Sequence, residues 1–73
     1  MTSEQYNKML PYKPVIQLFA KCGEYVGGCE ALFKMMHNDF GMELNLSCQS
    51  CMSAMLLTAN DLINDYERNL SSM

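Results

Sequence analysis

The sequence predicts a small all-α protein, built as a helical hairpin with a short additional helix at its N-terminal end. Apolar residues recur every three or four positions over residues 14–40 and again over residues 47–70, which is the period of one helix face. Between these stretches lies Gly41, a residue typical of a helix end. A chain of 73 residues is expected to form one domain, residues 1–73.

The short helix is predicted over residues 1–10. Thr2 or Ser3 can cap it, because a hydroxyl oxygen there accepts a hydrogen bond from a free backbone amide. Pro11 and Pro14 follow, and each disfavours helical backbone in the residue before it, so a stiff connector should lead into the long helix. The apolar face of the short helix would consist of Tyr6, Met9 and Leu10.

The long helix over residues 14–40 contains Gly23, Gly27 and Gly28, and each glycine costs about 1 kcal/mol relative to alanine inside a helix. The apolar positions nevertheless keep the helical phase across these glycines. We therefore predict a continuous helix with a kink at Gly27 and Gly28, and a break there is the alternative. The predicted apolar face comprises Val15, Ile16, Leu18, Phe19, Cys22, Tyr25, Val26, Cys29, Leu32, Phe33, Met36 and Phe40.

A stripe of small residues runs along this predicted helix, and small side chains let a second helix approach closely. The eight methionines add flexible apolar side chains, which suit adaptable binding surfaces as well as core filling. A simple kink and ordinary core packing are the alternatives to an interface. The residues predicted to form the interface are Ala20, Gly23, Gly27, Ala31, Met52 and Met55.

Residues 41–46 are predicted to form an extended connector, because Leu44 and Leu46 alternate with polar residues and should reach the core. Ser47 is a favourable N-cap for the last helix, predicted over residues 47–70. Two antiparallel helices enclose little volume, and their apolar faces are wide. The hairpin is therefore expected to be completed by oligomerisation or by a protein partner.

Composition argues against two classes of partner. The net charge is −3 and the chain has no cluster of Lys and Arg, which proteins use to neutralise nucleic-acid phosphates. No segment approaches the roughly 20 consecutive apolar residues of a membrane-spanning helix. The first residues lack the basic-then-apolar layout of a signal peptide, so a cytoplasmic location with reduced thiols is expected.

Four cysteines and one histidine are the candidate metal ligands: Cys22, Cys29, the C-x-x-C pair Cys48 and Cys51, and His37. In a first interpretation the pair is half of a structural zinc site, completed by two of the other three residues. On a straight helix Cys22 and Cys29 would lie roughly 10 Å apart. Such a site therefore requires a break in the long helix.

Two other interpretations of the cysteines are open. The pair could do redox chemistry, with Cys48 as the nucleophile at a helix N-terminus and Cys51 as the resolving thiol. The βαβ context typical of that motif is absent from the sequence. Alternatively, the cysteines are small core side chains, since all four fall on apolar helix faces. The core interpretation is preferred, which implies no cofactor, and zinc is the alternative.

The sequence contains no Gly-rich phosphate loop, no H-E-x-x-H and no G-x-S-x-G, so a non-enzymatic interaction or assembly module is predicted. Residues 45–52, Asn-Leu-Ser-Cys-Gln-Ser-Cys-Met, run into a helix with Leu56 and Tyr66. Over residues 40–67 this pattern resembles small uncharacterised proteins of tailed phages that infect gut bacteria. The resemblance implies a virion component or a host-directed inhibitory factor, located in the virion or the host cytoplasm.

Overall fold

The computed structural model describes residues 1–25 and 27–71 of the chain. All regular secondary structure within these residues is helical, which confirms the predicted all-α class. In chain order the elements are α1 (Ser3–Met9), the 3₁₀ helix η1 (Leu10–Tyr12), α2 (Lys13–Cys22), α3 (Glu30–Phe40) and α4 (Gln49–Ser71). The short first helix and the long last helix therefore lie where the sequence predicts them.

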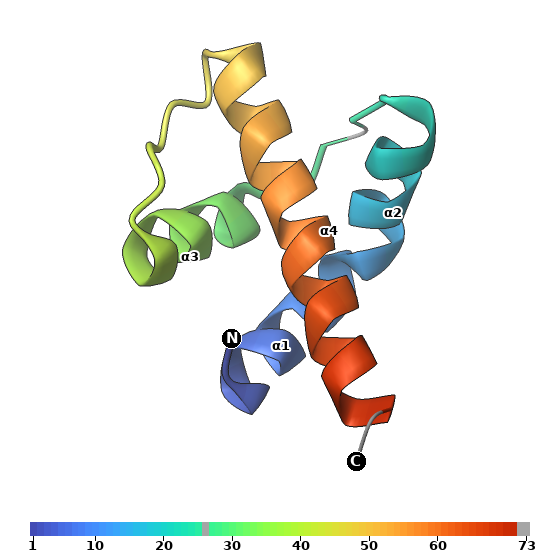
Figure 1. The fold of residues 1–73 in the computed structure, drawn as a ribbon. Coiled ribbons are helices and arrows are strands. Elements are labelled where there is room, and N and C mark those ends of the chain that lie inside the picture. Colours follow the sequence, from blue (N-terminus) through green and yellow to red (C-terminus); the bar gives the residue numbers. More distant parts are fainter. Residues whose placement is uncertain (26, 72–73) are drawn as a thin grey trace.

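Helix α4 is the centre of the fold. Figure 1 shows α2 along one side of α4, α3 on the other side and α1 near its C-terminal end. Helix α2 runs antiparallel to α4, because Lys13 at its start pairs with Glu67, whereas Phe19 near its end faces the same cleft as Met52 and Leu56. The predicted hairpin thus consists of α2 and α4, and α3 is a separate helix.

The predicted continuous helix over residues 14–40 is wrong, and the structure contains the break that was the alternative. The φ angles of Gly23, Gly27 and Gly28 are 75°, 92° and 84°. These values lie in the left-handed region, which glycine adopts easily and which a right-handed helix excludes. Val26, which the predicted apolar face included, lies outside the described residues.

The apolar phase survives the break for a physical reason. Helices α2 and α3 both pack onto α4, so each needs an apolar face of its own, and Ile16 of α2 and Phe33 of α3 are both fully buried. The two helices are separated by the seven residues 23–29. Two turns of an α-helix contain about the same number of residues. An interruption of that length preserves the apparent phase of a single helix.

The core draws on all four α-helices and on the end of the break. In the connector after α3, Leu44 packs against this core, but Leu46 is 45 % exposed, so only one of the two predicted leucines reaches it. The molecule is flat, with principal extents of 40 × 27 × 17 Å. The fully buried side chains are Met9, Ile16, Cys29, Leu32, Phe33, Met36, Met55, Leu56, Ala59 and Ile63.

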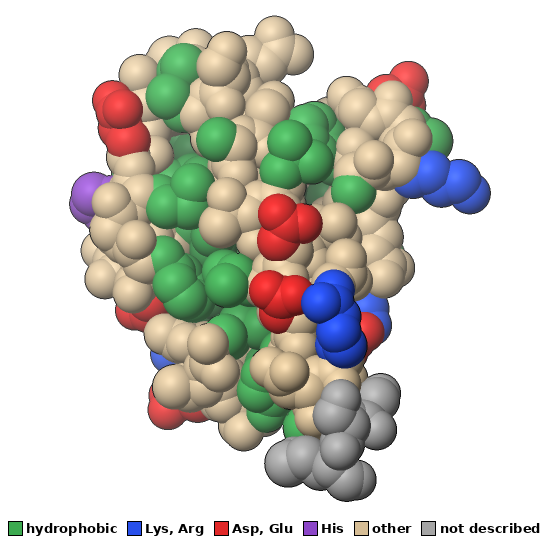
Figure 2. All heavy atoms as spheres, viewed as in Figure 1, with side chains coloured by type: hydrophobic (Ala, Val, Ile, Leu, Met, Phe, Trp, Pro, Cys, Tyr) green, Lys and Arg blue, Asp and Glu red, His purple; other side chains and the backbone are tan. Residues whose placement is uncertain are grey.

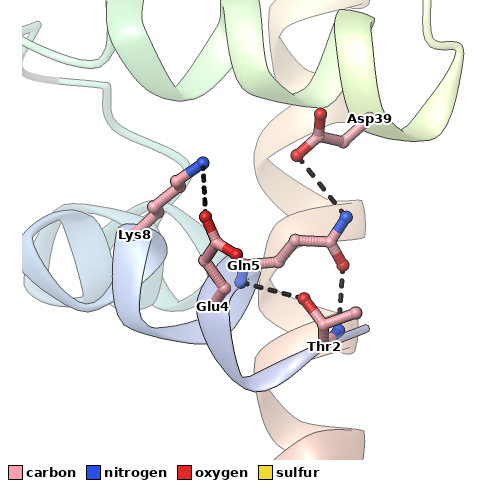
Figure 3. A network of polar contacts seen from close by, with 5 residues as sticks. All are labelled: Thr2, Glu4, Gln5, Lys8 and Asp39. Atoms are coloured by element: carbon pink, nitrogen blue, oxygen red, sulfur yellow. Dashed lines mark hydrogen bonds and ion pairs between the residues drawn. The ribbon is translucent and has the colours of Figure 1, made fainter.

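Polar contacts hold the N-terminal helix in place (Figure 3). The Thr2 hydroxyl accepts a hydrogen bond from the Gln5 backbone N–H at 3.2 Å, and the Gln5 side-chain oxygen accepts one from the Thr2 N–H at 2.9 Å. This reciprocal pair is a capping box, which confirms Thr2 as a cap. The Gln5 amide nitrogen also donates to Asp39 at 3.4 Å and so links α1 to α3.

A second set of contacts links α1 and α2 to the C-terminal half of α4. Glu67 accepts hydrogen bonds from the Lys13 ammonium group and, at 2.7 Å, from the Tyr6 hydroxyl. These two hydrogen bonds, the one from Lys13 first, hold the pKa of Glu67 below its ordinary value. Tyr6 also stacks on Tyr66, with 4.5 Å between the ring centroids.

We expect Glu67→Gln to lower the melting temperature at neutral pH and to matter less in acid. Because folding lowers the pKa of Glu67, its ionised form stabilises the fold fully above the ordinary value of 4.5 and loses this effect as pH falls through the folded pKa. Thermal melts followed by circular dichroism at neutral and acidic pH measure the difference. Asp65→Asn is the control, since the ion pair that Asp65 makes with Arg68 is exposed to solvent. Equal effects of the two substitutions at neutral pH would contradict this expectation.

Candidate functional site

The C-x-x-C pair lies where the connector ends and α4 begins. The Asn45 side-chain oxygen accepts a hydrogen bond from the Ser47 N–H at 3.0 Å, and the Asn45 carbonyl accepts one from the Cys48 N–H at 3.2 Å. The Cys48 carbonyl then accepts a helical hydrogen bond from Met52 at 3.1 Å, and α4 starts at Gln49. The capping residue is therefore Cys48 and not the predicted Ser47, which belongs to the turn before it.

The Cys48 sulfur takes the place of the usual N-cap oxygen. The Cys51 backbone N–H donates to Cys48 Sγ at 3.3 Å. A hydrogen bond from the Cys51 thiol, and then the backbone amides of Cys51 and Ser50, lower the pKa of Cys48. The same thiol hydrogen bond, together with partial burial, raises the pKa of Cys51 to about 11. The pair is thus asymmetric, because its surroundings lower the pKa of one thiol and raise the pKa of the other.

The remaining two cysteines lie elsewhere. Cys22 is exposed at the end of α2, whereas Cys29 is fully buried next to the start of α3. Burial, and secondarily the charge of Glu30, raise the pKa of the Cys29 thiol. The interpretation of the cysteines as core side chains therefore holds for Cys29 and fails for Cys22.

The structure does not assemble the predicted zinc ligands. In the described part of the chain, no group of three or more His, Cys, Asp and Glu side chains could hold a metal ion. His37 is exposed, with its Nδ1 2.6 Å from the carbonyl oxygen of Met42. The break that the zinc site required is present, but it leaves Cys22 at the surface and Cys29 in the core. Two cysteines alone fall short of the four ligands of a structural zinc site.

A cleft of about 290 Å³ opens beside the C-x-x-C turn. Ser47 and Gln49, the chain neighbours of Cys48, form part of its wall. Figure 2 shows hydrophobic side chains exposed in the notch between the N-terminal end of α4 and the C-terminal end of α2. The cleft is therefore apolar within and polar near the turn. Its full lining is Phe19, Gly23, Tyr25, Ser47, Gln49, Met52, Ser53 and Leu56.

The cleft contains two of the six residues predicted to form an interface, Gly23 and Met52. Met55 is 1 % exposed and belongs to the core. The predicted small-residue stripe does not exist as a continuous surface, because the helix that would carry it is broken. Its other members are separated, on α2, in the break and on α3: Ala20, Gly27 and Ala31.

From the sequence, the aromatic walls of the cleft, Phe19 and Tyr25, are predicted only as part of the apolar helix face. Helical periodicity shows that a residue faces inward, but it does not show whether a neighbouring helix covers that residue. Tyr25 also lies outside any helix, and its hydroxyl accepts a hydrogen bond from the Cys29 N–H at 3.2 Å. No local signal in the sequence indicates this contact.

The fold and the turn define a small all-α protein with an asymmetric pair of thiols at the start of its longest helix. Comparison with protein-family models, curated proteins and solved structures found no match for the chain. None of the helices in residues 1–25 and 27–71 combines the length and the apolar character that crossing a membrane requires.

Proposed function

We propose that the chain is a non-enzymatic helical interaction module that assembles through the cleft between α2 and α4, with a second copy of itself as the occupant. Exposed apolar side chains beside the cleft carry this proposal. Leu57 is 48 % exposed and Leu46 is 45 % exposed. Leu46 precedes Ser47 of the cleft wall, and Leu57 lies one helical turn beyond Ser53 of the same wall. Apolar surface therefore extends from the cleft onto its rim.

The surface around the cleft offers both a hollow and a projecting side chain. A two-fold symmetric interface uses the same surface on both copies, so Leu57 of one copy can enter the cleft of the other, and the reverse. Full burial of one leucine side chain contributes about 1.5–3 kcal/mol, and the symmetry doubles that gain. A leucine side chain is small enough to enter a cleft of about 290 Å³.

The size of the chain supports the same proposal. The core of a domain this short rarely supplies more than roughly 3–5 kcal/mol, so covering the apolar rim would add a substantial fraction. The acidic net charge of −3 and the absence of catalytic motifs in the sequence favour a protein partner over nucleic acid or substrate turnover. The resemblance of residues 40–67 to small phage proteins indicates that such a module would be a virion component or a host-directed inhibitory factor of a phage.

Leu57→Glu is expected to weaken self-association by at least about tenfold, because a charge placed at an apolar contact costs more than 1.4 kcal/mol. Sedimentation velocity over a range of concentrations measures the change. Leu70→Glu is the matched control: Leu70 is 46 % exposed on the same helix, and it lies about 20 Å further along α4.

The control variant should associate like the wild type, and both variants should retain the helical content of the wild type. If Leu57→Glu associates as strongly as Leu70→Glu, the cleft and its rim are not the interface. An equal weakening in both variants would indicate charge repulsion and would equally contradict the proposed location.

A further inference from the structure

The Cys48–Cys51 pair has features that neither assembly nor core packing requires. A core cysteine is expected to be fully buried, as Cys29 is, yet both members of the pair are only half-buried. A cap alone would be served as well by serine, whose hydroxyl is among the preferred N-cap groups. The Cys51 N–H instead donates to a sulfur, Cys48 Sγ, at 3.3 Å, and a second thiol is held beside it.

We propose that Cys48 and Cys51 form a dithiol site that reduces one external disulfide per chain by thiol–disulfide exchange, without turnover, with Cys48 as the attacking sulfur. The site is one turn of backbone in which the Cys51 N–H donates to Cys48 Sγ at 3.3 Å, and it adjoins the cleft through Ser47 and Gln49. This inference does not depend on the proposed self-association.

The exchange has two balanced steps. The Cys48 thiolate attacks one sulfur of the external disulfide, whose S–S bond breaks, and the other sulfur leaves as a thiolate and takes a proton from water. Cys51 then loses its proton to water and attacks Cys48 Sγ, which expels the second substrate sulfur as a thiolate that takes a proton from water. The substrate gains two electrons and two protons, and the protein gains a Cys48–Cys51 disulfide.

The geometry of the turn suits both steps. Residues three apart in a helical turn have Cα atoms roughly 5 Å apart, which is inside the usual disulfide range of about 4.4–6.8 Å. Before the reaction, the hydrogen bond between the Cys51 thiol and the Cys48 sulfur raises the pKa of Cys51. Once Cys48 is in the mixed disulfide, it carries no charge and this effect disappears. Cys51 is therefore released to act at the moment when the second step needs it.

The other cysteines provide internal references for reactivity. Cys22 is exposed and lies at the end of α2, away from the turn, whereas Cys29 is fully buried. If accessibility alone controlled the thiols, Cys22 would react first. If the turn activates Cys48, then Cys48 should react first despite its half-buried position, because the thiolate is the nucleophile.

The test uses the full chain and peptide-resolved mass spectrometry. At neutral pH, iodoacetamide should alkylate Cys48 severalfold faster than Cys22, with Cys29 slowest. Oxidised glutathione should convert the wild type to a Cys48–Cys51 disulfide and release reduced glutathione. Cys51→Ser should stop at a glutathione mixed disulfide on Cys48, whereas Cys48→Ser should form a glutathione adduct on Cys51 much more slowly.

Both serine variants are expected to fold, because serine can cap a helix at position 48 and can donate a hydrogen bond at position 51. Cys22→Ser is the control and should leave the products at the turn unchanged. The proposal is overturned if Cys22 is alkylated as fast as Cys48. It is also overturned if the wild type accumulates glutathione adducts without forming the Cys48–Cys51 disulfide.

Discussion

Phe33→Ala is expected to leave most of the protein unfolded at room temperature. Phe33 is fully buried on α3, and its ring lies 5.6 Å from the ring of Tyr25 in a tilted arrangement. Truncating a buried phenylalanine costs about 3–5 kcal/mol, because apolar contacts are lost and a cavity remains. That loss is as large as the roughly 3–5 kcal/mol that the core of a domain this small supplies.

Far-UV circular dichroism and urea titration measure the effect of Phe33→Ala. Lys34→Ala is the matched control, because it changes the adjacent, exposed residue of the same helix and should alter the free energy of unfolding by less than about 0.5 kcal/mol. A Phe33→Ala variant with a cooperative transition close to that of the wild type would show that α3 does not pack onto α4 as described.

Ile63→Asp is expected to be nearly as disruptive, for an electrostatic reason. Ile63 is 1 % exposed on α4, and none of the buried side chains among the described residues is polar or charged. An unpaired buried charge costs several kcal/mol, unless the group becomes protonated and its pKa rises accordingly. The penalty should therefore be full at neutral pH and should diminish as pH falls and the carboxyl group becomes neutral.

Asn64→Asp is the control for Ile63→Asp, since it introduces the same group at the neighbouring, exposed position. Urea midpoints of the two variants should differ strongly at neutral pH and should converge in acid. Using the difference between variants removes the acid sensitivity that both share through Glu67. A constant difference across pH would mean that the carboxylate at position 63 reaches solvent.

The helices were predictable from the sequence where a local signal specifies them. The Thr2 cap, the apolar period of α4 and the end of α3 at Gly41 are each specified by residues that lie close together in the sequence. Each of these predictions is confirmed. The continuous helix through Gly27 failed because a period of apolar residues does not report backbone φ angles. Because two helical turns contain about seven residues, a seven-residue break leaves the same sequence pattern as an unbroken helix.

The candidate site was only partly predictable. The C-x-x-C spacing indicated Cys48 and Cys51 as a pair, and the helix start was placed within two residues of its actual position. The asymmetry of the two thiols depends on the donation from the Cys51 amide and thiol to Cys48 Sγ, which a sequence does not display. The cleft arises from packing α2 against α4, a contact between residues more than thirty positions apart in the chain.

Native mass spectrometry of the full chain, purified without chelator, is the most direct test of assembly through the cleft. We expect a dimer of the apo protein at high micromolar concentration, which dissociates to monomer on dilution. Dimer loss in Leu57→Glu but not in Leu70→Glu would place the contact at the cleft rim. A wild-type chain that remains monomeric at every concentration would contradict self-association as the function of this surface.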